Sequence, residues 1–213
     1  VPAAPSNALQ LLAQDKTCKR IEQFERQSGL DLGREAHLGT RALPSPRRIA
    51  EDMIAIVATA SPRPATVMHG DFCFSNILFN SRTNRVRLLD PRGTLDGIHS
   101  TNGGDSRYDM AKLAHSVIGL YDLIIAGRVR ARHQGHMDFD LALPDHSQEY
   151  LAMSRWFLSL KVSGTAFGED VVIASMILLF LSMLPLHADR PDRQLCFLAN
   201  ALRLYENFFG NEG

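Results

Sequence analysis

The sequence feature that most constrains the fold is a stretch between residues 67 and 93 that alternates apolar and polar segments. It predicts a strand, a polar loop, a second strand from residue 77, a turn through residues 80–85, and a third strand that ends at residue 89. Three polar residues stand at the junctions: Asp71, Asn76 and Asp90. Because the turn folds the third strand back on the second, we expect Asp90 to lie near Asn76.

An Asp, an Asn and a second Asp in this order suit phosphoryl transfer, a reaction that depends on positioning and on neutralised charge. Asp71 can orient a substrate hydroxyl and accept its proton. Asn76 and Asp90 can supply hard oxygen ligands for Mg²⁺ on the phosphates of ATP. Each motif alone is also typical of an ordinary turn or strand end, but the three together indicate a kinase-like site.

These motifs resemble those of the aminoglycoside phosphotransferase and choline kinase family of small-molecule kinases. The string from His69 to Asn76 is similar to the family signature H-G-D-x-x-x-x-N, and Asp90 closes the apolar strand that follows. The resemblance covers residues 66–113. It implies the C-terminal lobe of a protein-kinase-like fold, with Asp71 as the catalytic base.

The resemblance also implies roles for three supporting residues. Residues 105–111 are similar to the family segment in which an Asp begins a helix and supports the catalytic loop, so Asp109 is expected to hold that loop. His69 is expected to shape the loop through hydrogen bonds rather than to take part in chemistry. Arg92 can touch a phosphate or form a surface ion pair.

Composition excludes several other classes of protein. The 213 residues include 23 acidic and 23 basic side chains, and a zero net charge argues against a nucleic-acid or membrane-surface binder. Three Cys residues without a C-x-x-C spacing favour a reducing, cytoplasmic compartment and give no zinc or disulfide pattern. The most apolar run, residues 171–186, is short for a membrane span and is expected to be a buried helix.

Hydrophobic periodicity and capping residues predict a mainly helical chain outside the catalytic stretch. The helices are expected at residues 6–28, 46–60, 108–127, 147–163, 169–187 and 190–209. Residues 29–46 and 128–145 are expected to be irregular. Glycines 103 and 104 are expected at the tip of a surface segment between residues 93 and 107.

The fold class predicted from these elements is α+β, mainly α, with a small catalytic β-hairpin and flanking helices. We expect one kinase-like C-terminal lobe over residues 1–213. It divides into a helical lead-in (1–65), the catalytic and metal loops (66–95), and a helical subdomain on the substrate side (105–213). The acceptor is expected to bind between the catalytic loop and the helices after residue 147.

A kinase of this family also has an N-terminal lobe with a Gly-rich phosphate loop, a strand Lys and a helix Glu. None of these is found before His69, so that lobe is expected from the same longer protein. The predicted function is Mg²⁺-dependent transfer of the ATP γ-phosphate to a hydroxyl of a sugar, an amino alcohol or an aminoglycoside. The alternative is a non-catalytic kinase-like binding or regulatory module. A protein kinase is disfavoured by Gly70 and by the lack of an A-P-E-like segment after Asp90.

Overall fold

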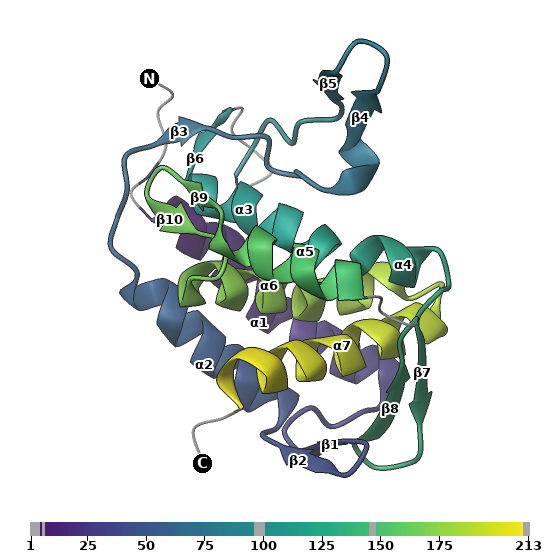
Figure 1. Ribbon diagram of the computed structural model, residues 1–213. Helices are drawn as coiled ribbons and strands as arrows, with labels where there is room; N and C mark the ends of the chain where they lie inside the picture. The colour runs from purple at the N-terminus through teal and green to yellow at the C-terminus, as the bar shows by residue number, and fades with distance from the viewer. Residues whose placement is uncertain (1–4, 6, 96–100, 145–147, 211–213) are drawn as a thin grey trace.

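Helix α6, Asp170–Met183, runs through the middle of the helical body, and helices α1, α2, α3 and α7 pack against it (Figure 1). The structure is a computed structural model that describes residues 5, 7–95, 101–144 and 148–210. Predictions that concern residues 1–4, 6, 96–100, 145–147 and 211–213 lie outside the described residues. The α+β, mainly α fold class is confirmed.

The elements follow one another in chain order. The helices are α1 Ala8–Ser28, α2 Pro46–Thr59, η1 Phe74–Asn76, α3 Ser106–Val117, α4 Tyr121–Ile125, α5 Gln148–Ser159, α6 Asp170–Met183, η2 Leu184–His187 and α7 Pro191–Phe209. The strands are β1 Ala36–Leu38, β2 Arg41–Leu43, β3 Thr66–Val67, β4 Ile77–Asn80, β5 Arg85–Leu88, β6 Gly103–Gly104, β7 Arg130–His133, β8 Asp138–Ala142, β9 Lys161–Val162 and β10 Thr165–Ala166.

The first two helices begin and end where the sequence predicts. Helix α1 ends at Gly29, which adopts the left-handed conformation with φ of 72°. Helix α2 begins after Ser45, whose hydroxyl accepts a hydrogen bond from the Arg48 N–H, and Pro46 occupies its first turn. Local capping chemistry therefore accounts for the end of α1 and the beginning of α2.

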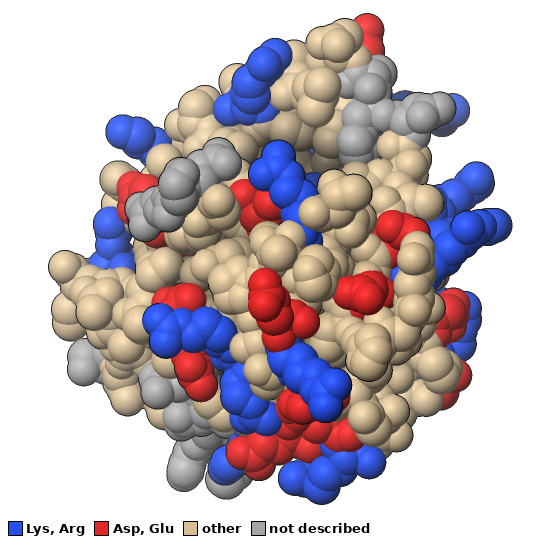
Figure 2. Space-filling model, turned by 90° about the horizontal axis from the view of Figure 1, so that it is seen from below, with Lys and Arg blue, Asp and Glu red and all other residues tan. Residues whose placement is uncertain are grey.

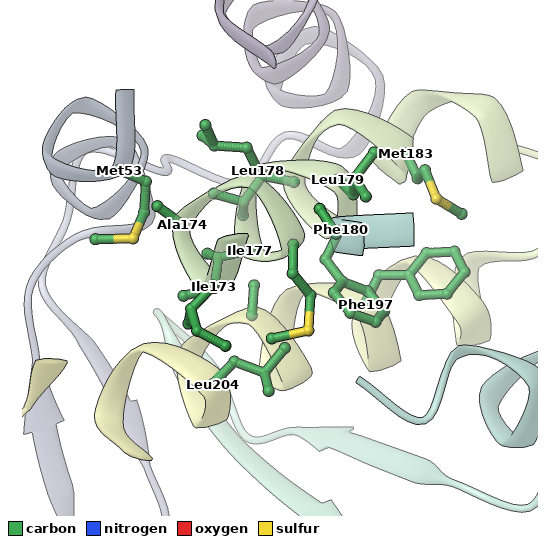
Figure 3. Close-up of a cluster of buried hydrophobic side chains, with 14 of the residues drawn as sticks. Met53, Ile173, Ala174, Ile177, Leu178, Leu179, Phe180, Met183, Phe197 and Leu204 are labelled. Atoms are coloured by element: carbon green, nitrogen blue, oxygen red, sulfur yellow. The ribbon is translucent and has the colours of Figure 1, made fainter. Parts of the chain in front are cut away.

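Helix α6 is apolar on every side because every side is covered. Figure 3 shows Met53 of α2 and Phe197 and Leu204 of α7 around the side chains of α6. Residues 170–187 are long and apolar enough to cross a membrane, but 83% of that stretch is buried within the fold. A buried core helix, as expected from the sequence, accounts for this composition.

The face of the helical body seen from below, away from the β4–β5 hairpin, carries Lys and Arg interspersed with Asp and Glu (Figure 2). No single sign of charge dominates it. This mixture agrees with the zero net charge of the sequence.

Two segments predicted to be irregular contain strands instead. Strands β1 and β2 lie within residues 29–46, strands β7 and β8 lie within residues 128–145, and together they form a sheet in the order β2-β1-β8-β7. Its central pair is parallel, with His37 opposite Asp138, and His37 Nδ1 lies 2.9 Å from Asp138 Oδ1. The prediction was wrong in both segments. Strands β1 and β2, and strands β7 and β8, pair as local hairpins. The pair that joins them into one sheet, β1 with β8, links residues about a hundred positions apart, where a local pattern carries no information.

The helix predicted over residues 108–127 is broken into α3 and α4. Leu120 adopts φ of 59°, and Asn200 and Arg203 of α7 donate hydrogen bonds to the carbonyls of Gly119 and Ile118. These side chains satisfy the carbonyls that a continuous helix would have used. The tertiary contact with α7 therefore overrides a helical period that the sequence shows clearly.

Glycines 103 and 104 are not a surface tip, contrary to the prediction. They form strand β6, which is buried and pairs antiparallel with β3. The side chain of Met68 leaves no room for a Cβ atom at Gly104. The glycines therefore allow close packing here rather than a mobile loop.

Candidate active site

One face of helix α3 holds the loop between β3 and β4. The Asp109 carboxylate accepts hydrogen bonds from the N–H groups of His69 (2.7 Å) and Gly70 (2.8 Å). Seven residues further along the same face, the Ser116 hydroxyl accepts one from the Phe74 N–H at 3.1 Å. Burial raises the pKa of Asp109, and the two backbone hydrogen bonds lower it by less. The buried carboxylate therefore anchors the start of the loop.

Gly70 occupies a position that requires glycine. Its φ is 79°, and a Cβ atom there would lie 2.7 Å from the Cβ atom of Arg92. Arg92 approaches closely because its N–H donates to the His69 carbonyl at 2.8 Å. The close approach of the two segments explains why the second residue of the H-G-D string has no side chain.

Asp71, the predicted base, lies between a Lys and an Asn. Lys112 Nζ of α3 is 2.7 Å from Asp71 Oδ1, and Asn76 Nδ2 donates to Asp71 Oδ2 at 3.1 Å and to the Asp71 carbonyl at 2.9 Å. Burial alone would raise the pKa of Asp71, but the charge and hydrogen bond of Lys112, with Arg92 and Asn76, hold that pKa below its usual value. Asp71 is therefore ionised at neutral pH.

Lys112 was not identified from the sequence. It follows Asp109 by three residues and precedes Ser116 by four, so the three polar side chains share one face of a helix whose other faces are largely buried. That stripe of polar residues at helical spacing is the signal that could have indicated Lys112. The lysine belongs to the site because its ammonium group contacts the carboxylate of Asp71.

Asp90 lies two residues after the end of β5, at the open end of the β4–β5 hairpin, opposite its turn. Leu89 donates its N–H to the Asn76 carbonyl at 2.9 Å, and Ile77 pairs with Leu88. Asp90 is exposed and has φ of 54°, a left-handed conformation that Asp tolerates better than most residues. The hairpin thus brings Asp90 next to the backbone partner of Asn76, as expected from the sequence.

Asn76 and Asp90 have the donor atoms that Mg²⁺ prefers. The amide nitrogen of Asn76 is bonded to Asp71, so its oxygen Oδ1 is the atom that can face a cation. Within the described ranges, no cluster of three His, Cys, Asp or Glu residues could hold a metal ion by itself. This is compatible with magnesium bound to a nucleotide, which uses one or two protein ligands together with phosphates and water.

His69 and Arg92 support the loop from within. His69 is buried, its Nδ1 accepts a hydrogen bond from the Asp71 N–H at 3.3 Å, and its ring lies against Phe72. The Arg92 guanidinium donates to the Tyr108 hydroxyl at 3.1 Å and lies over the ring of Tyr108 at 5.5 Å. Both side chains therefore pack within the protein around Asp71, in the segment of residues 66–95 that the sequence predicts to be catalytic.

Asp71 opens into a cavity of about 280 Å³ between the loop, α1, α3 and the end of α6. Its lining is mostly polar and includes residues from the end of α6 and from η2, among them Leu179, Ser182, Met183 and His187. A larger cavity, about 570 Å³, lies on the other side of the loop, has mainly apolar walls and does not include Asp71. We regard the smaller one as the candidate substrate site, because Asp71, the predicted base, lines it.

Comparison of the chain with protein-family models, curated proteins and solved structures gives no match. The functional argument therefore depends on the motifs and on the geometry described above.

Proposed function

We propose that the chain carries the catalytic half of a small-molecule kinase, an ATP-dependent phosphotransferase with an alcohol acceptor, and that its fold corresponds to the C-terminal lobe of a protein-kinase-like protein. One observation carries the proposal. An ionised Asp71, held by Lys112 and Asn76, lines a polar cavity, and the hairpin places Asp90 directly after Leu89, whose N–H donates to the Asn76 carbonyl.

The proposed reaction follows from the positions of these groups. The acceptor hydroxyl enters the cavity and donates a hydrogen bond to Asp71, which orients the oxygen. This oxygen forms a bond to the γ-phosphorus of ATP while the bond from that phosphorus to the bridging oxygen of ADP breaks, and Asp71 takes the hydroxyl proton. Asn76 and Asp90 would hold Mg²⁺, which neutralises the charge of the phosphates.

Lys112 has a distinct part in this scheme. A carboxylate that accepts a proton has to be ionised before the reaction, and Lys112 favours the ionised form of Asp71. Each carboxylate oxygen has two lone pairs. Asp71 can therefore accept a hydrogen bond from a substrate hydroxyl while it keeps its contacts with Lys112 and Asn76.

The test is titration of Mg²⁺-ATP into the chain by calorimetry, with Asp90→Ala and Asp71→Asn beside the parent. We expect Asp90→Ala to weaken nucleotide binding at least about tenfold, because a metal ligand is lost. Asp71→Asn should keep nucleotide binding and lower phosphate transfer about 10²- to 10⁴-fold. The control is Asp192→Asn, an exposed carboxylate at the start of α7, which should change neither.

Two results would contradict the proposal. Equal binding of Mg²⁺-ATP by the parent and by Asp90→Ala would remove the metal role of Asp90. Phosphate transfer by Asp71→Asn within about tenfold of the parent would remove the base role of Asp71. Failure of the parent alone to bind Mg²⁺-ATP would mean either that the chain is only the catalytic lobe of a longer kinase or that it is the alternative, a kinase-like module that binds a partner or regulates.

A further inference from the structure

The candidate substrate cavity is lined by more positive than negative side chains. Arg20 of α1, Arg92 of the catalytic segment and Lys112 of α3 all border it. Among its described lining residues, Asp71 is the only carboxylate. This contrasts with the mixed charges on the face shown in Figure 2.

The ion pair with Asp71 neutralises Lys112, whereas the hydrogen-bond partners of the two arginines within the described part of the chain are neutral. The charge of Arg92 also acts on Asp71 and Asp109, without a direct ion pair to either among the described contacts. Arg20 Nη1 donates to the Ser182 carbonyl at 3.2 Å, and Arg92 Nη1 donates to the Tyr108 hydroxyl at 3.1 Å. A guanidinium has five N–H donors in a planar fork. Each arginine can therefore hold an oxyanion without giving up the contact that fixes its position.

The two guanidinium groups also act on one another. Burial lowers the pKa of Arg20, Tyr108 opposes this effect, and the charge of Arg92 lowers that pKa further. Like charges held together in a partly buried cavity repel, and a bound anion removes that repulsion. A bound ammonium group in this cavity would instead add to the repulsion among the positive charges.

We propose that the acceptor is a small anionic hydroxyl compound whose carboxylate or phosphate group is bound by Arg20 and Arg92 while its hydroxyl faces Asp71. The inference rests on the proposed function, since it concerns the acceptor of that reaction. A cavity of about 280 Å³ limits the acceptor to a small molecule. Amino alcohols and aminoglycosides, which are cations, do not suit this lining.

The experiment measures anion binding without nucleotide. Arginine Nε–Hε signals are followed in ¹H–¹⁵N NMR spectra while inorganic phosphate, acetate or tetramethylammonium is added at constant ionic strength. We expect phosphate or acetate to shift the signals of Arg20 and Arg92, and the stronger of the two identifies the anionic group. Tetramethylammonium should shift neither signal.

Two variants and a control establish where the anion binds. Arg20→Gln and Arg92→Gln should each weaken binding of the preferred anion at least about fivefold, because each removes one charged fork. Since either variant alone can alter folding, agreement between the two is required. Arg26→Gln, on the same helix with its side chain 70% exposed, should leave binding unchanged.

The acceptor assignment is overturned if neither anion shifts the two arginine signals or if tetramethylammonium binds in the cavity. It is also overturned if Arg20→Gln weakens Mg²⁺-ATP binding as much as anion binding, because the arginines would then serve the nucleotide. Failure of the proposed function is a separate result, seen as Mg²⁺-ATP binding that does not depend on Asp90. In that case Arg20 and Arg92 would still bind anions, but the cavity would no longer be assigned as the acceptor site.

Discussion

Helix α6 and the β4–β5 hairpin are both rich in large apolar side chains, yet their surroundings are opposite. In α6, residues 172–183 are all buried. In the hairpin, Leu78, Phe79, Val86 and Leu88 are 49–62% exposed, and the hairpin stands away from the helical body in Figure 1. Similar residues therefore serve different ends: α6 stabilises the fold, whereas the hairpin positions Asn76 and Asp90 and contributes little to the described core.

The sharpest test of this contrast is the same substitution in both regions. Phe180 of α6 is fully buried, and its ring contacts those of His115 and Phe197. Phe180→Ala should lower the free energy of unfolding by about 3–5 kcal/mol, because it removes apolar contacts and leaves a cavity. Urea unfolding followed by circular dichroism gives this value.

Phe79→Ala in the hairpin is the matched control. Phe79 is 62% exposed, so the change should stay within about 0.5 kcal/mol. Comparable losses in the two variants would mean that the hairpin packs against something in solution, and the contrast with α6 would fail.

A second test concerns the junction between the two regions, where the catalytic loop is fixed. Gly70→Ala should cost about 2–3 kcal/mol, since the new side chain meets both a left-handed backbone and the Cβ atom of Arg92. Gly93→Ala has the same backbone conformation, with φ of 67°, but no atom within 4 Å of the new Cβ. It should cost about 1 kcal/mol. Equal costs in urea unfolding would show that the contact with Arg92 adds nothing.

The sequence predicted the parts of the molecule whose causes are local. Helices α1 and α2 carry their own caps, and the apolar run of α6 indicates a buried helix by itself. The sheet that joins β1 to β8 and the break after α3 depend on distant partners, so their residues show no local sign of them. In the candidate site, the motif order predicted Asp71, Asn76 and Asp90, whereas Lys112, which contacts Asp71, lies outside the motifs and was not predicted.

The prediction with the smallest expected effect concerns Lys112. Its contact with Asp71 joins helix α3 to the loop that precedes the β4–β5 hairpin. In Lys112→Met a side chain of similar size loses its charge. The effect of burial is then offset only by Arg92 and Asn76, so the pKa of Asp71 should rise. A ¹³C NMR titration of the Asp71 carboxyl measures this shift. Lys161→Met, an exposed lysine of β9, is the control and should leave the pKa of Asp71 unchanged.

The pH dependence of stability gives a second measurement on the same variant. The folded pKa of Asp71 lies below its ordinary value of 3.8, so the pair stabilises the fold above that pH, and the contribution disappears as the pH falls through the folded pKa. The pKa of Lys112 is raised above its ordinary 10.5, because Tyr108 and Asp71 outweigh the effect of burial. Its contribution is therefore complete below that pH and is lost as the pH rises through the folded value. Lys112→Met should lower the free energy of unfolding by about 1 kcal/mol at pH values between the ordinary pKa of Asp71 and that of Lys112. At a pH below the folded pKa of Asp71 it should not change the free energy of unfolding. A cost that does not change with pH would mean that Lys112 acts through packing and not through its charge.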